Sequence, residues 1–302
     1  CSAAFSPRAG MCLLRTHAQR DHPAAIAGDG VTILSFQSDV VSGHVGHGAA
    51  RLALQCLGHD VWAVPTVLLS HHPGHGKPAM LGVEAATLRA FTQSLKQLHG
   101  FHRVSAVHQG YLANAAQAEA VREAVIAVKI DNPQARFLCD PVFGDDDGAY
   151  GAPGVAEAMA RHLIPLADIV TPNRFELASL TSQRVEDMAG AVRAARVLAR
   201  PVIVATSIPD GSNLATIAVT PHAAFAASTP CHENVPHGTG DLLAALLLGH
   251  LVSGADLETA LARATGSVDA VIRKSLGREE LALVAARNDL AHAPGLSVRR
   301  LS

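Results

Sequence analysis

From Val31 onward, short apolar or β-branched runs alternate with longer Ala- and Leu-rich stretches that have a helical period. The runs predict strands at Val31–Phe36, Asp60–Val64, Arg103–His108, Arg136–Asp140, Asp168–Val170, Pro201–Thr206 and Leu214–Val219. The clearest predicted helices are Ala86–Leu98, Ala113–Val128, Val155–Leu163, Val185–Ala199 and Thr239–Val252. This order predicts an α/β fold, a three-layer αβα sandwich with a mainly parallel central sheet flanked by helices. Ligands of such folds gather beyond the carboxyl ends of the strands.

The alternating pattern runs through the chain as one domain, predicted over residues 31–302. No repeat, low-complexity tract or Pro/Ser-rich linker interrupts residues 31–290. Residues 1–30 differ, because they carry several arginines, no acidic residue before Asp21 and only a short apolar patch, Met11–Leu14. The patch is too short for the apolar region of a signal peptide. We therefore expect residues 1–30 to be a disordered or targeting-like N-terminal extension.

Composition narrows the class of protein. Of the 302 residues, 49% are apolar and 17% charged, enough for a sizeable buried core. The formal net charge of -2 implies no broad basic surface, so nucleic acid is not an expected partner. No apolar run approaches the ~20 residues of a spanning helix, so no membrane association is expected. The five cysteines are scattered without a CxxC pair, which favours a reducing, cytoplasmic location.

Gly238-Thr239-Gly240-Asp241 directly precedes an apolar stretch, Leu242–Leu248, which predicts a buried helix. Glycines let a ligand approach the backbone, and the free N–H groups of a helix N-terminus stabilise a phosphate. Asp241 in the first turn could take a proton from a substrate hydroxyl while its oxygen attacks a γ-phosphate. The alternative is that Asp241 merely complements the helix dipole.

Two further motifs follow predicted strands. Asn173 and Glu176 come after the strand Asp168–Val170 and could orient Mg²⁺ around a polyphosphate, or they could simply form a capping box. Asp140 ends another strand, where Pro141 stops it, and could assist the metal or cap a turn. All three side chains are expected at the same edge of the sheet as Asp241.

Seventeen histidines raise the possibility of metal storage, especially around His71, His72 and His75. The chain has no HExxH motif, and a surface or loop position explains most histidines equally well.

In combination, these motifs resemble the ribokinase-like superfamily, and within it the pyridoxal kinases. The other segments that carry the resemblance, which spans about residues 31–290, are Ser35–Gly46, Ser70–Gly76, Gly110–Leu112, Cys139–Gly144 and Ala152–Glu157. The resemblance implies transfer of the γ-phosphate of ATP to the 5′-hydroxyl of pyridoxal, with pyridoxine and pyridoxamine as further acceptors. It also implies Mg²⁺ with ATP, a monovalent cation such as K⁺, a homodimer, and no large lid domain.

The resemblance further implies a role for individual residues. Asp241 would be the catalytic base, and Gly238, Thr239 and Gly240 would form the anion hole. Acceptor contacts would come from Ser38, Val45, Pro73, Gly74 and Tyr111. Nucleotide contacts would come from Asp140, Thr171, Asn173, Glu176, Thr206 and Ser207, with Asp140 and Glu176 on the metal.

The chain departs from the pattern of the family at five positions. The family usually has Asn and Ser at His47 and Gly48, and many members have Thr at Pro73. Some have a reactive Cys at Ala149, and Lys often replaces Thr206. These departures keep two alternatives open, a hydroxymethylpyrimidine kinase and a catalytically weak protein that binds vitamin B6.

Overall fold

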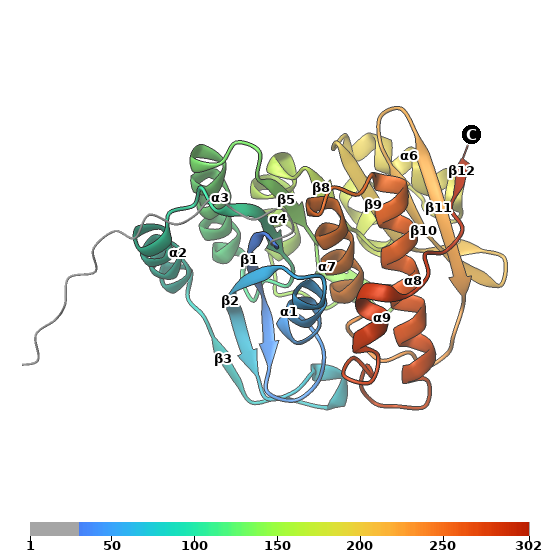
Figure 1. Ribbon diagram of the computed structural model, residues 1–302, viewed down its shortest axis with the longest axis horizontal. Helices are drawn as coiled ribbons and strands as arrows, with labels where there is room; N and C mark the ends of the chain where they lie inside the picture. The colour runs from blue at the N-terminus through green and yellow to red at the C-terminus, as the bar shows by residue number, and fades with distance from the viewer. Residues whose placement is uncertain (1–29, 302) are drawn as a thin grey trace, which may run out of the picture.

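The computed structural model describes residues 30–301. The predicted N-terminal extension therefore lies, except for Gly30, outside the described residues. Ten strands form one sheet, in which they lie side by side in the order β12-β11-β10-β9-β8-β5-β4-β1-β2-β3 (Figure 1). Its parallel strands are β1 (Thr32–Val40), β2 (Asp60–Leu69), β4 (Val104–Gln109), β5 (Arg136–Cys139), β8 (Ile169–Val170) and β9 (Val202–Asp210).

Antiparallel strands flank this parallel centre. They are β3 (Met80–Gly82) on one side and β10 (Asn213–Val219), β11 (Ala224–Pro230) and β12 (Arg299–Leu301) on the other. The predicted strand at Leu214–Val219 is thus present but antiparallel to β9. Only Gly211 and Ser212 connect β9 to β10, and a parallel crossover needs a dozen or more residues.

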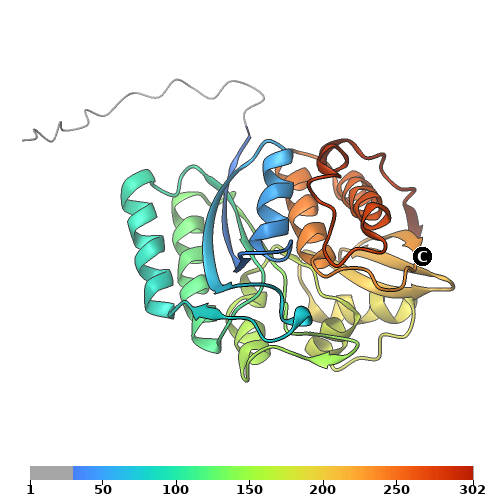
Figure 2. The same cartoon turned by 90° about the horizontal axis from the view of Figure 1, so that it is seen from below.

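Helices cover both faces of the sheet, as the view in Figure 2 shows. One face carries α1 (His47–Cys56), α7 (Thr239–Val252), α8 (Leu257–Ser275) and α9 (Arg287–His292). The other carries α2 (Ala85–His99), α3 (Ala115–Asp131), α4 (Val155–His162), α5 (Arg174–Thr181) and α6 (Met188–Leu198). The predicted three-layer α/β sandwich is confirmed.

Small elements complete the fold. The 3-10 turns η1 (Pro73–His75) and η2 (Ile164–Leu166) lie in connections, and β6 (Gly144–Asp145) and β7 (Gly148–Ala149) form a short hairpin. Within residues 30–301, this hairpin is the one sheet separate from the ten-stranded sheet, so the described chain has no large lid domain. No described helix is both long and apolar enough to cross a membrane.

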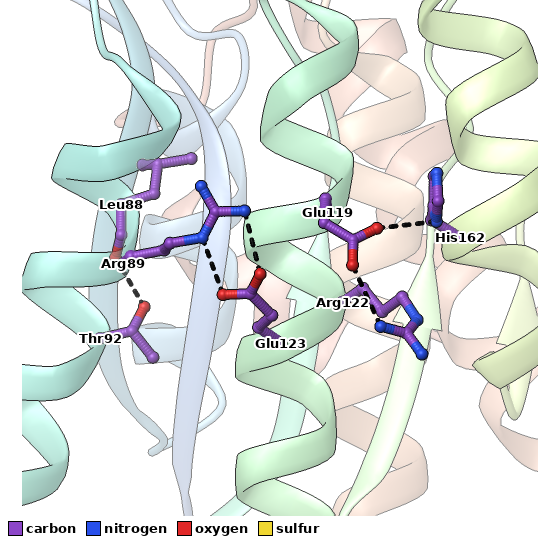
Figure 3. Close-up of polar contacts among 7 residues, drawn as sticks. All are labelled: Leu88, Arg89, Thr92, Glu119, Arg122, Glu123 and His162. Carbon is purple, nitrogen blue, oxygen red and sulfur yellow. Dashed lines mark hydrogen bonds and ion pairs between the residues drawn. The ribbon is translucent and has the colours of Figure 1, made fainter.

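The outer helices α2, α3 and α4 show how one helix serves both core and surface. Leu88 of α2 is fully buried, whereas its neighbour Arg89 forms two hydrogen bonds with Glu123 of α3, at 2.8 and 2.9 Å (Figure 3). Glu119 of α3 pairs with His162 of α4 at 2.9 Å. Polar contacts therefore link the solvent sides of three helices whose inner sides pack on the sheet.

Helix α7 has no such polar side. Each residue from Leu242 to Leu251 is buried, and the helix lies between α1 and α8. Burial on every side agrees with its apolar sequence and leaves only the N-terminus of α7 open to a ligand. The fold thereby presents Gly238–Asp241 at the carboxyl edge of the parallel strands.

Candidate active site

A pocket of about 660 Å³ opens beyond the carboxyl ends of β1, β2, β4, β5, β8 and β9. Most of the predicted site residues line it, namely Ser38, Val45, Pro73, Gly74, Tyr111, Asp140, Thr171, Asn173, Glu176, Thr206, Gly238, Gly240 and Asp241. Thr239 and Ser207 are not on its wall, and Ser207 is exposed in the left-handed conformation at φ 58°. The pocket thus gathers residues that are up to 203 positions apart in the sequence.

The N-terminus of α7 forms the floor of the pocket. Gly238 has φ 102°, and a Cβ at this position would lie 2.2 Å from the carbonyl oxygen of His44. At Gly240, by contrast, a Cβ would meet no atom within 4 Å. The first N–H groups of a helix have no acceptor within it, so the open space beside Gly240 suits an anion.

Asp241 does not cap its own helix, because α7 has no side-chain cap. Its Oδ2 instead accepts a hydrogen bond of 2.8 Å from the N–H of Gly46, in the loop that follows β1. Burial raises the pKa of Asp241 to about 6, and the Gly46 bond opposes that rise. A carboxylate at a pocket wall whose pKa lies close to neutral pH fits a general base better than a residue that only complements the helix dipole.

The adjoining wall is rich in carboxylates. Asp140 is 5% exposed, and its Oδ1 accepts a 2.8 Å hydrogen bond from the hydroxyl of Thr171. Burial, followed by the charge of Asp241, raises the pKa of Asp140 to about 8. Burial and the charge of Asp140 also raise the pKa of Glu176 well above its usual value. Burial and a neighbouring negative charge therefore both disfavour the ionised forms of Asp140 and Glu176.

The capping-box interpretation of Asn173 and Glu176 is confirmed, and their role in orienting Mg²⁺ stays a prediction. Asn173 caps α5 by accepting from the N–H of Glu176, whose Oε2 accepts from the N–H of Asn173, so the capping box is complete. Oε1 of Glu176 accepts from the N–H of Phe143, and both side chains still line the pocket. The capping box is therefore what holds Glu176 at the wall.

The carboxylates fit a magnesium ion that arrives with a polyphosphate. Among the described residues that line the pocket there is no lysine or arginine. A cation would therefore have to offset the charge of a polyphosphate bound beside these carboxylates. Mg²⁺ is usually bound through one or two carboxylates together with substrate phosphates. Within residues 30–301, no three His, Cys, Asp or Glu side chains form a group able to hold a metal ion, and this includes the described histidines.

The opposite wall is more apolar. Ser38 is nearly buried, and Val45, Tyr111, Val67 and Leu69 surround the cavity beside it. Tyr111 is fixed through its carbonyl oxygen, which accepts a 2.7 Å hydrogen bond from the hydroxyl of Thr66. A flat ring with polar groups on its edge would match this combination.

Several residues that line the pocket were not predicted as site residues, and two of them, His72 and His237, contact each other. His72 and His237 line the cavity, and their rings stack with centroids 4.1 Å apart. Burial, then the neighbouring His237 and His75, lower the pKa of His72 to about 4. The position of His237 directly before Gly238 was a usable signal, but its pairing with His72 joins segments that are 165 residues apart.

The departures from the family pattern lie in different surroundings. Pro73 is on the pocket wall and offers neither a hydroxyl nor an N–H. Thr206 lies on the wall as well, and its N–H donates to the carbonyl oxygen of Pro172. His47 is buried away from the wall, where its Nε2 lies 3.1 Å from Oγ of Ser35. Ala149 is exposed on β7.

The chain is similar to known proteins over most of its length. Residues 76–283 match the family model described as phosphomethylpyrimidine kinase. Over 287 positions the chain is 38% identical to pyridoxal kinase PdxY of Rubrobacter xylanophilus, covering 91% of this chain and 99% of the relative. Pyridoxal kinase PdxY of Corynebacterium diphtheriae is 34% identical over 272 residues, covering 87% and 96%.

A solved structure is similar over the same span. Pyridoxal kinase from Leishmania donovani, in complex with ADP and pyridoxine, has a TM-score of 0.84 and 28% identity. The match covers 90% of this chain and 99% of the other. The chain therefore belongs to the pyridoxal kinases, within the phosphomethylpyrimidine kinase family of ribokinase-like enzymes.

Proposed function

We propose that this enzyme transfers the γ-phosphate of ATP to the 5′-hydroxyl of pyridoxal, with pyridoxine and pyridoxamine as further acceptors. The observation that carries the proposal is the position of Asp241. Its carboxylate lies at the pocket wall, at the N-terminus of α7. Its charge raises the pKa of Asp140, and it accepts a hydrogen bond from Gly46, which lies against Ser38. The names of the relatives give the substrates.

In the proposed reaction Asp241 accepts the proton of the 5′-hydroxyl while the hydroxyl oxygen forms a bond to the γ-phosphorus. The bond from that phosphorus to the bridging oxygen of ADP breaks, and ADP leaves with the electron pair. The N–H groups of Gly238, Thr239 and Gly240 would receive the negative charge on the transferred phosphoryl oxygens. The side chain of Thr239 need not line the pocket for this role.

The acceptor would lie against the apolar end of the pocket. Val45 and Tyr111 would flank the pyridine ring, and Ser38 would hydrogen-bond a polar group on its edge. Pro73 and Gly74 would close the outer side through contact alone.

The nucleotide would lie along Thr171, Asn173 and Thr206, with Ser207 at the rim. Asp140 and Glu176 would hold Mg²⁺, which when bound neutralises charge on the β- and γ-phosphates. A monovalent cation, K⁺, would help to offset the remaining charge, since no described lysine or arginine lines the pocket.

We further propose that the enzyme is a cytoplasmic homodimer. The three described cysteines, Cys56, Cys139 and Cys231, are free, as a reducing compartment requires. Val41, Met80 and Leu81 are each at least 65% exposed near the β3 edge of the sheet. An exposed apolar sheet edge usually has a partner, and a second copy of the chain would supply one.

A coupled assay of ADP release tests the activity. We expect turnover that depends on pyridoxal and Mg-ATP, and a loss of about 10²- to 10⁴-fold in kcat for Asp241→Asn. Full activity in that variant would disprove the role of Asp241. Tight pyridoxal binding without a phosphorylated product would instead indicate a B6-binding protein.

The name of the family favours one second candidate, a hydroxymethylpyrimidine kinase. Side-by-side competition between pyridoxal and hydroxymethylpyrimidine distinguishes the two activities. We expect pyridoxal to have the higher kcat/KM, and the reverse order would select the second candidate.

A further inference from the structure

Three segments that are far apart in the sequence meet at the carboxylate of Glu280. Oε2 of Glu280 accepts a 3.2 Å hydrogen bond from the N–H of His44, in the loop that carries Val45 and Gly46. Oε1 lies 3.0 Å from Nε2 of His75, in the η1 turn. One side chain from the connection between α8 and α9 thus joins the loop after β1 to the turn after β2.

The backbone around these contacts is shaped to allow them. Gly43 has φ 110°, and a Cβ there would lie 2.7 Å from Oε1 of Glu280. At Gly74 a Cβ would lie 2.8 Å from Nε2 of His237. The positive φ of Gly43 favours glycine there, and at both positions a side chain would displace the end of the side chain that it meets, Glu280 at Gly43 and His237 at Gly74.

The residues that follow Glu280 are anchored in the core. The next residue, Leu281, is 1% exposed and lies against Gly238, where a Cβ would approach its Cδ1 to 3.2 Å. Ala282 donates its N–H to Oγ of Ser275, at the end of α8. The carboxylate is therefore carried by the same core that holds the N-terminus of α7.

The η1 turn is a thin wall of the pocket. Pro73 and Gly74 line the cavity on one side and are exposed to solvent on the other. The turn is attached at two points, through the ring contact of His72 with His237 and through the polar contact of His75 with Glu280. Releasing the second attachment would free the half of the turn that faces solvent.

We propose that Glu280 is a positioning residue that latches the η1 turn to residues 43–46 and so controls entry and retention of the phosphate acceptor. The latch acts on the acceptor side only, because the nucleotide-side residues Thr171, Asn173 and Thr206 belong to other segments. It makes no contact with the reacting atoms. The identity of the acceptor rests on the function proposed above, whereas the latch itself does not.

Hydrogen exchange tests the latch without turnover. We expect Glu280→Ala to speed amide exchange about fivefold in peptides that cover residues 42–46 and 72–76, and to leave α7 unchanged. Glu279→Gln is the matched control, since Glu279 is the exposed neighbour and carries the same charge. His75→Ala should speed exchange in 72–76 alone, because the His44 bond remains. Unchanged exchange in Glu280→Ala would overturn the proposal.

Steady-state kinetics give the second readout. We expect Glu280→Ala to raise the KM for pyridoxal about fivefold and to leave kcat and the KM for ATP within about twofold. A parallel rise in both KM values with a lower Tm would mean that Glu280 is merely structural, and would also overturn the latch. If the wild-type enzyme does not phosphorylate pyridoxal, the proposed function fails, but the hydrogen-exchange experiment still tests whether Glu280 holds the η1 turn. Failure of one proposal can therefore be distinguished from failure of the other.

Discussion

The N–H of Gly46 donates a 2.8 Å hydrogen bond to Oδ2 of Asp241. This bond joins the loop that follows β1 to the residue proposed as catalytic base. Gly46 adopts φ 53°, and a Cβ there would lie 2.2 Å from the carbonyl oxygen of Ser38. The close turn at Gly46 therefore brings Ser38 and Asp241 to the same place in the pocket. In the proposed reaction, this backbone group would couple recognition of the acceptor to removal of its proton.

The first prediction concerns the pH dependence of catalysis. Burial raises the pKa of Asp241 to about 6, and only the deprotonated carboxylate can accept the proton of the hydroxyl. We therefore expect kcat/KM for the acceptor to fall about tenfold per pH unit below pH 6. Initial rates with pyridoxine between pH 5 and 8 measure this limb. The residual activity of Asp241→Asn should lack it, and an identical limb in that variant would assign it to another group.

The second prediction separates the two roles of Glu176. Glutamine also completes a capping box, so Glu176→Gln keeps the helix cap while removing the charge proposed to hold Mg²⁺. We expect Tm to stay within about 3 °C and the Mg²⁺ concentration for half-maximal activity to rise about tenfold or more. Titration of Mg²⁺ at fixed ATP measures the second effect.

Glu176→Ala provides the comparison, because it removes the capping-box bond to the N–H of Asn173 as well as the charge, while Asn173 still caps the helix. We expect this variant to lose about 1 kcal/mol of stability in addition to its activity. Normal Mg²⁺ dependence in Glu176→Gln would contradict the metal role and leave the capping role alone.

Much of the fold follows from local pattern. The predicted strands lie within or beside the observed ones because apolar runs mark buried parallel strands. The prediction for β1 ended at Phe36, yet the strand continues to Val40. Gln37 and Ser38 are polar and do not extend the apolar run, but Gln37 is fully buried and its Nε2 lies 3.1 Å from Nδ1 of His108. Such partners depend on tertiary register, which local pattern does not contain.

Helix α8 was missed although the sequence carries a signal for it. Asp256 caps the helix by accepting from the N–H of Thr259, and Glu258 lies in the first turn. Gly266 lies in the interior of α8 and interrupts the apolar pattern from which a helix is predicted. A Cβ at this position would lie 2.2 Å from the carbonyl oxygen of Pro294. Gly266 therefore permits the backbone at Pro294 to approach α8 closely, and it does not interrupt the helix.

The candidate site divides in the same way. The place of Asp140 on the pocket wall was predictable because the carboxyl ends of parallel strands share one edge, whereas Thr171 was expected there only through the family resemblance. The contacts of His237 and Glu280 were not, since they join loops whose relative positions are set by the packing of α7 and α8. Their recognition required the structure.

The third prediction contrasts two neighbouring residues on α2. Leu88 is fully buried, so we expect Leu88→Ala to lower the free energy of unfolding by about 2–5 kcal/mol. The ion pair of Arg89 with Glu123 is exposed, so Glu123→Gln should cost less than about 1 kcal/mol. Urea denaturation measures both. Only the cost of Glu123→Gln should shrink when NaCl is raised, and a salt-dependent cost for Leu88→Ala would contradict the assignment.

The fourth prediction concerns two buried histidines. His47 and His108 are 2% and 0% exposed, and burial lowers the pKa of His47 to about 4 and that of His108 to about 3. Between these values and 6.5 the unfolded chain binds protons that the folded chain does not. Stability is therefore complete above pH 6.5 and falls as the pH decreases, by about 1.4 kcal/mol per pH unit for each histidine.

His47→Asn tests this linkage because asparagine can still hydrogen-bond Ser35 but does not titrate. Between pH 7.5 and pH 5 we expect the wild-type protein to lose about 2 kcal/mol more of its unfolding free energy than the variant does. Urea denaturation at both pH values measures the difference. His222→Asn, at an exposed turn, is the control and should leave the loss unchanged. An equal loss in wild type and His47→Asn would mean that His47 is protonated in the folded protein, against the burial that surrounds it.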